Sequence, residues 1–218
     1  MTGRSPCLPK AHIEAAGPLV PGRMVKNRLD ESVERQPDNP VAYKLRASWC
    51  QHFGGLADSS AIQADFQTAI RLAEQDVEGA HLALHGLDVH AQRSHVLAYC
   101  HFQLATLLQQ GKDFAAAAVH YRAALEQADP DSIQLADLHF NLAIITILTA
   151  GPAWEEQAAA LGDAARHYKA GLAAAKRRRR WCMVGNDVSQ ELAAALLARV
   201  SSMIKVAPKK PLSQKKDD

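Results

Sequence analysis

An internal repeat constrains the fold of this chain more than any other feature of its sequence. The segment HFQLATLLQQG (101–111) returns as HFNLAIITILTAG (139–151), with histidine, phenylalanine, leucine and alanine at the same relative positions. Tyr121 follows the first copy and Tyr168 the second, and the interval from histidine to tyrosine is nine residues longer in the second copy. Repeats of this length are typical of helix pairs that bury their hydrophobic faces against neighbouring pairs.

The composition favours helices throughout. Alanine is abundant, above all in 115–128 and 158–175, whereas the β-branched and aromatic residues that favour strands are sparse. Breaks such as QPDNP (36–40), GKD (111–113) and ADPDS (128–132) divide the chain. We therefore expect an all-α protein. The periodicity predicts helices at 23–35, 41–53, 58–75, 93–110, 114–127, 133–149 and 155–178, with a last helix that begins at 185–187.

The unit 101–131 resembles a tetratricopeptide repeat. Leu104 and Ala105 occupy its first helix, Ala117 and Tyr121 its second, and Pro130 closes it. The resemblance extends over about 41–176, with a further copy upstream around Tyr43 and Phe66. It implies a superhelix of about three antiparallel helix pairs, with 188–204 as a C-terminal capping helix. The helical-repeat domain would span 23–204, between an irregular arm (1–22) and a basic disordered tail (205–218). A generic helical bundle is the alternative.

The resemblance also implies where a partner would bind. In such repeats the first helix of each pair lines a concave groove, and the aligned positions here combine aromatic rings with amides, which suits an extended peptide. These positions are Lys44, Ser48, Tyr99, Phe102, Gln103, Thr106, Asp137, Phe140 and Asn141. Lys44 stands where family members that bind a peptide carboxylate carry a lysine, while Ser48 and Gln103 replace the asparagine and second lysine of that clamp. We therefore expect a non-catalytic adaptor or chaperone-like scaffold that binds a peptide or a partner protein.

The charge distribution suggests a different partner. The net charge is only +2, but the residues from Arg166 onward include 13 Lys or Arg against 4 Asp or Glu. A run of five cations stands out there: Lys176, Arg177, Arg178, Arg179 and Arg180. Together with the lysine-rich tail, this run could contact nucleic acid or another polyanion, which makes a nucleic-acid-associated accessory protein the alternative function. A solvated helix end and a nuclear import signal are further interpretations of the same residues.

Catalytic motifs are missing from the sequence. It contains no glycine-rich phosphate loop, no G-x-S-x-G and no H-E-x-x-H, so we expect neither enzymatic activity nor a cofactor. His81 and His85 are four residues apart and could share a metal ion on a helix, but Gly79 and Gly86 favour a polar linker instead.

The cysteines and the hydrophobic runs bear on where the chain resides. The four cysteines (Cys7, Cys50, Cys100 and Cys182) have no metal-binding spacing, and we expect them to be reduced. The sequence begins without a secretory signal and has no apolar run long enough to span a membrane. A cytoplasmic protein is expected, and assembly with copies of itself stays open.

Overall fold

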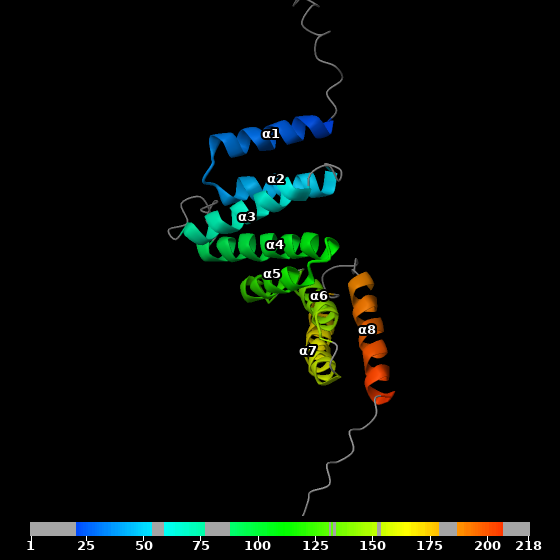
Figure 1. Cartoon of the computed structure of the whole chain (residues 1–218). Helices are drawn as coiled ribbons and strands as arrows, with labels where there is room; N and C mark the ends of the chain where they lie inside the picture. Colours follow the sequence, from blue (N-terminus) through cyan, green and yellow to red (C-terminus); the bar gives the residue numbers. More distant parts are fainter. Residues whose placement is uncertain are drawn as a thin grey trace, which may run out of the picture.

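The chain folds into helices that follow one another along an elongated molecule (Figure 1). The computed structural model describes residues 21–53, 59–76, 88–130, 132, 134–151, 154–178 and 187–206. Within these ranges there are eight helices and no strand, which confirms the all-α prediction. The helices are α1 (Pro21–Arg35), α2 (Pro40–Phe53), α3 (Ser59–Gln75), α4 (Val89–Gln110), α5 (Phe114–Gln127), α6 (Leu135–Leu148), α7 (Trp154–Arg178) and α8 (Asp187–Val206).

Local side-chain chemistry determines where the two central helices begin. Asp88 caps α4, because its carboxylate accepts a hydrogen bond from the backbone N–H of His90. This cap lets α4 begin four residues before the expected start at residue 93. Asp113 likewise accepts from the backbone N–H of Ala116 and caps α5, whose bounds match the predicted 114–127.

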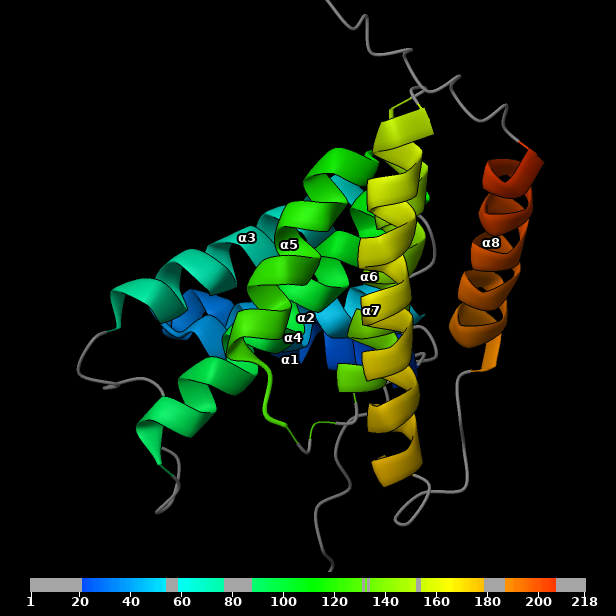
Figure 2. The ribbon, with the colours of Figure 1, turned by 90° about the horizontal axis from the view of Figure 1, so that it is seen from below.

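Each helix packs against the next one along the chain. The contacts run from α1 through α7, α2 also meets α4, and α8 packs on both α6 and α7. Figure 1 shows α1 to α5 lying across the long axis of the molecule one after another, while α6 and α7 turn to run along it. Seen from below, α8 stands beside the α6–α7 pair at the end of the molecule (Figure 2).

Three hydrophobic clusters follow this stacking. The first joins α2, α3 and α4 around Phe66 and Cys100, and the second joins α4, α5 and α6 around Tyr121. The third joins α6, α7 and α8 around Phe140. Helix α4 therefore belongs to two clusters. As expected from the repeat, the small residues Ala105 and Ala117 are fully buried where α4 and α5 approach each other.

One arginine connects the first three helices. Arg46 in α2 donates through Nε and Nη2 to both carboxylate oxygens of Asp65 in α3, at 2.7 Å each, and through Nη1 to Asp30 in α1 at 3.4 Å. The hydrogen bonds to Asp65 are the largest cause of the raised pKa of Arg46. This bidentate contact fixes the relative orientation of α2 and α3.

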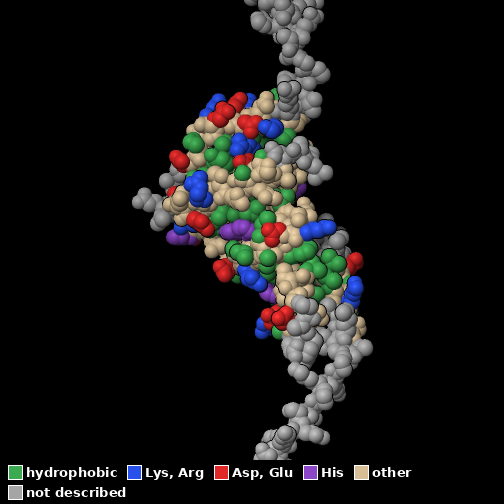
Figure 3. All heavy atoms as spheres, viewed as in Figure 1, with side chains coloured by type: hydrophobic (Ala, Val, Ile, Leu, Met, Phe, Trp, Pro, Cys, Tyr) green, Lys and Arg blue, Asp and Glu red, His purple; other side chains and the backbone are tan. Residues whose placement is uncertain are grey.

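Charged side chains are spread over the face of the molecule that Figure 3 shows. In Figure 3 acidic and basic side chains alternate over the visible face, without a large area of one sign. In the part of the chain that the structure describes, no helix has both the length and the apolar character needed to cross a bilayer.

Candidate functional site: a groove along α4

Two pockets open along one side of α4, and together they contain most of the residues expected to line a groove. Tyr99, Phe102 and Thr106 project on one side of the helix because they are three and four residues apart. Lys44 and Tyr99 line the first pocket, whereas Phe102, Thr106, Asp137 and Asn141 line the second.

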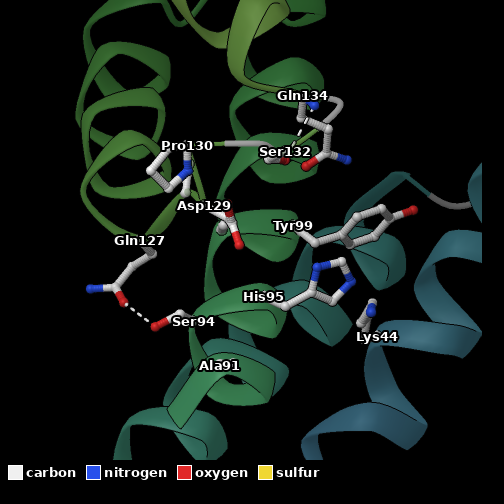
Figure 4. Close-up of a pocket in the computed structure, with 12 residues that line it drawn as sticks. Lys44, Ala91, Ser94, His95, Tyr99, Gln127, Asp129, Pro130, Ser132 and Gln134 are labelled. Atoms are coloured by element: carbon white, nitrogen blue, oxygen red, sulfur yellow. Dashed lines mark hydrogen bonds between the residues drawn. The ribbon is translucent and has the colours of Figure 1, made fainter. Parts of the chain in front are cut away.

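The first pocket, of about 720 Å³, brings a lysine and a histidine together. Lys44 from α2 points into it, with Nζ 4.9 Å from the centroid of the Tyr99 ring in α4. In Figure 4 the side chains of Lys44, His95 and Tyr99 lie on the same side of the pocket. The opposite wall is formed by Gln127, Asp129, Pro130 and Ser132, and Gln127 accepts a hydrogen bond from Ser94 at 3.3 Å.

Lys44 is a half-buried cation that has no ion pair among the described residues. Burial lowers the pKa of Lys44, because the charged ammonium loses hydration in the pocket. The pKa of His95 is lowered as well, first by burial and then by the charge of Lys44. The π face of Tyr99 offsets part of the lost hydration of the lysine. An incoming anion would therefore relieve an existing electrostatic cost.

The second pocket, of about 420 Å³, has a polar lining. Tyr121 from α5 donates to Gln109 at 2.9 Å, and its hydroxyl also lies 3.2 Å from that of Thr106. The pKa of Tyr121 is raised to about 12, chiefly by burial and further by the charge of Asp137. The carboxylate of Asp137 and the amide of Asn141 approach from α6. This lining suits a ligand group that donates hydrogen bonds.

Three of the expected groove residues lie outside both pockets. Ser48 hydrogen-bonds to the backbone carbonyl of Lys44 within α2, at 2.7 Å. Gln103 is 9% exposed on α4. Phe140 differs most from the expectation, since its ring is only 2% exposed and packs in the third cluster against α7. Its ring is therefore part of the core and cannot act as a surface platform for a peptide.

The basic run is described only in part. Lys176 and Arg177 are exposed near the end of α7. Arg178 closes that helix, and Arg179 and Arg180 lie outside the described residues, as do His81 and His85. Within the described residues no group of three His, Cys, Asp or Glu side chains is placed to hold a metal ion.

The structure also brings together histidines that the sequence analysis did not select. His101 of α4 faces His120 of α5 with their Nδ1 atoms 2.9 Å apart, and His139 of α6 faces His167 of α7 at 3.2 Å. The helix pairs α4–α5 and α6–α7, which we call the two hairpins, also share the next contact along the chain. Phe102 contacts Tyr121 in the first hairpin, and Phe140 contacts Tyr168 in the second. In the sequence, the doublets His-Phe and His-Tyr occur in both copies of the repeat and could have indicated these histidine pairs.

Comparison with known proteins does not identify a family for this chain. No family model matches the chain, and a search of curated proteins finds no sequence similar to it.

Proposed function

We propose that the protein is a non-catalytic adaptor that binds an extended segment of a partner protein along α4, with an acidic group of that segment in the Lys44 pocket. The observation that carries this proposal is the half-buried ammonium of Lys44, which rests on Tyr99 and has no carboxylate partner among the described residues. A carboxylate placed there would form a charge-assisted hydrogen bond in a partly dehydrated site, where such bonds are strongest.

The second pocket supports an extended ligand rather than a small ion. It continues along the same side of α4, from Phe102 to Gln110, and its lining includes the side chains of Gln109, Asp137 and Asn141. A peptide that places an acidic group beside Lys44 could thus place a donor side chain or its own N–H groups here. The resemblance of 101–131 to a tetratricopeptide repeat favours this use of the surface, since repeats of that kind bind partners through the first helix of each pair.

A binding experiment tests the proposal directly. Random 12-residue peptides displayed on phage would be selected on the immobilised protein, and the enriched sequences measured as labelled synthetic peptides by fluorescence anisotropy. We expect enrichment of peptides with Asp, Glu or a free C-terminal carboxylate. Lys44→Gln should weaken their binding about tenfold or more, because a charge-assisted hydrogen bond at a half-buried site is worth about 1.5–3 kcal/mol.

Lys169→Gln is the matched control, because Lys169 is an exposed lysine of α7 far along the chain from both pockets. Its substitution should change the dissociation constant less than twofold. Tyr99→Ala and Phe102→Ala should also weaken binding, whereas Phe140→Ala is unsuitable because it would open the core. Equal binding by wild type and Lys44→Gln would refute the assignment of the pocket, and so would a selection that enriches no peptide.

The two exposed cations at the end of α7 do not distinguish nucleic acid from other polyanions. The described part of the basic run has no further feature that recognises bases or phosphates. We therefore propose only the groove along α4 as a binding site.

A further inference from the structure

We propose that His101–His120 and His139–His167 are a duplicated pair of proton-sharing bridges, each of which holds the two helices of one hairpin together and opens when both of its imidazoles carry a proton. The inference is independent of the proposed function, because it concerns the packing of the hairpins and not the pockets.

The geometry of both bridges is that of a hydrogen bond between rings. The Nδ1 separations are 2.9 and 3.2 Å, and the ring centroids lie 5.2 and 5.5 Å apart. In each pair the centroid distance exceeds the Nδ1 distance by about one ring diameter, so both nitrogens lie near the line that joins the ring centres. One ring must therefore donate through Nδ1–H while the other accepts through the lone pair of its Nδ1.

A metal ion fits this arrangement poorly. A metal binds imidazole nitrogen at about 2.0–2.1 Å, so an ion on the line between two Nδ1 atoms needs them about 4 Å apart. The observed separations are well below this value and fall where a nitrogen donor meets its acceptor. The head-on rings thus favour a shared proton over a shared metal.

Protons control such a bridge in two steps. A first proton can enter at the Nε2 atom of the donor ring, and the resulting imidazolium still donates its Nδ1–H to the neutral partner. A second proton occupies the accepting Nδ1, so that two N–H groups face each other and both rings are positively charged. The bridge then has no acceptor, and the like charges repel. Opening therefore depends on the second proton.

The surroundings of the first bridge disfavour protonation. Both rings are half-buried between α4 and α5. Burial, and then the neighbouring charge of His120, lower the pKa of His101 to about 4. Burial also lowers the pKa of His120. No carboxylate takes part in either shift, so nothing in the described structure compensates the second charge.

The second bridge has charged neighbours of both signs. Burial lowers the pKa of His139, assisted by His167 and by Arg177 from the end of α7. Burial likewise lowers the pKa of His167, with Asp163 raising it and Arg122 and Arg166 lowering it further. The arginines outnumber the single carboxylate, so this bridge also favours the uncharged state.

The sign of the pH effect follows from these shifts. Histidines of the unfolded chain take up protons near pH 6.5, whereas the bridged rings of the folded chain do so only at lower pH. The unfolded state therefore binds more protons between about pH 6.5 and about pH 4, and the free energy of unfolding must fall as the pH falls through this window. Above pH 6.5 the bridges contribute their full stabilisation.

The test compares glutamine bridges with histidine bridges. Glutamine pairs can still hydrogen-bond across a hairpin but do not titrate, so His101→Gln/His120→Gln and His139→Gln/His167→Gln should fold at pH 7.5. Urea denaturation followed by circular dichroism at pH 7.5, 6, 5 and 4.5 gives the unfolding constant. Without one bridge, the chain should take up as many as two fewer protons on unfolding than the wild type does. The unfolding constant of the variant should then change less with pH than that of the wild type, by a factor of up to 100 per pH unit.

The control is His52→Gln/His90→Gln, which removes two exposed histidines that belong to neither bridge. The pH dependence of its unfolding constant should be closer to that of the wild type than the pH dependence of either bridge variant is. A bridge variant that retains the full acid dependence of the wild type would overturn the proposal.

A second measurement on the unmodified protein serves if the glutamine variants do not fold. Long-range ¹H–¹⁵N spectra at pH 7.5 should show one Nδ1–H and one Nε2–H tautomer in each bridge. The loss of this pattern on acidification should coincide with faster amide exchange in α4 to α7. Four imidazoles with averaged tautomers and the titration of free histidine would contradict the bridges.

Discussion

At the scale of single residues, Gly171 shows how closely the second hairpin is packed. A Cβ atom at this position of α7 would lie 2.7 Å from Cε1 of Phe140, inside van der Waals contact. The phenylalanine ring is almost completely buried, and side chains in a close-packed core have little room to move. The absence of a side chain at residue 171 is therefore a requirement of α6–α7 packing.

The contrast between two glycines of α7 gives a prediction. Gly171→Ala should lower the free energy of unfolding by about 1 kcal/mol, because overpacking costs about 1–3 kcal/mol and outweighs the gain of about 0.5–1 kcal/mol in helix propensity. Gly162→Ala should raise it by about 0.5–1 kcal/mol, since an added Cβ would meet no atom within 4 Å apart from its chain neighbours and the backbone of its own helix. Urea denaturation of both variants measures the difference, and effects of the same sign would contradict the close contact with Phe140.

Single residues are also where prediction from the sequence was weakest. The turn between α4 and α5 lies at GKD as predicted, and its positive φ of 65° belongs to Lys112 while Gly111 keeps a helical conformation. Glycine is the usual residue for such a φ, so local sequence favours the wrong position. Phe140 aligns with Phe102, yet one ring is buried and the other lines a pocket. That difference depends on packing with α7 and α8, which a repeat alignment does not contain.

At the scale of helices, Arg46 is the contact that orients α1 and α3 on α2. Its side chain is 23% exposed, and its main partner Asp65 is 15% exposed. Loss of the guanidinium would leave the Asp65 carboxylate in a half-buried site without the hydrogen bonds that compensate its burial. The pair therefore stabilises the arrangement of the first three helices more than a surface ion pair could.

Removal of that arginine supplies the next prediction. Arg46→Gln should lower the free energy of unfolding by about 1.5–3 kcal/mol, the usual value for hydrogen bonds to a charged group. Arg35→Gln is its control, since Arg35 is an exposed cation 3.6 Å from Glu31 and its loss should change the stability by less than about 0.5 kcal/mol. Thermal and urea denaturation would measure both, and equal effects would mean that the Arg46 contact is no stronger than a surface pair.

The helices themselves were largely predictable. Proline or aspartate at the breaks marks where α2 and α5 begin, and alanine with leucine at helical spacing fills the segments between. The early start of α4 was missed because Gly86 and the histidines obscured the cap at Asp88. Pockets were harder to foresee, since Lys44 and His95 meet only through the packing of α2 on α4.

At the scale of the whole molecule, contacts run mainly between helices adjacent in sequence, and α8 touches only the last pair apart from minor contacts. A molecule with this contact pattern need not unfold as one unit, because each cluster depends on its neighbours and not on the whole. The three clusters share α4 and α6 as common walls.

A charge placed under α8 tests this independence. Ala193 is fully buried in the third cluster, so Ala193→Glu should detach α8 by burying a carboxylate without a partner. Hydrogen exchange read by mass spectrometry should show protection lost in α6, α7 and α8 while α2, α3 and α4 keep theirs. The exposed substitution Ala159→Glu, on α7, should leave exchange unchanged. Uniform loss of protection along the chain would instead indicate a single cooperative unit.

The glycine at residue 171 has a consequence for the kinetics of folding. The two hairpins have similar sequences, so each helix could pair with a wrong partner: α6 could take the place of α4 on α5 before α7 has formed. Such mispairing is a common trap in repeat chains. The position three residues after the tyrosine is Gly171 in α7 but Ala124 in α5. On α5 the ring of Phe140 would meet a methyl group where on α7 it meets none. The missing methyl group at residue 171 thus allows α6 to pack more closely on α7 than in the place of α4 on α5. This difference favours the correct pairing of α6 before the core has closed.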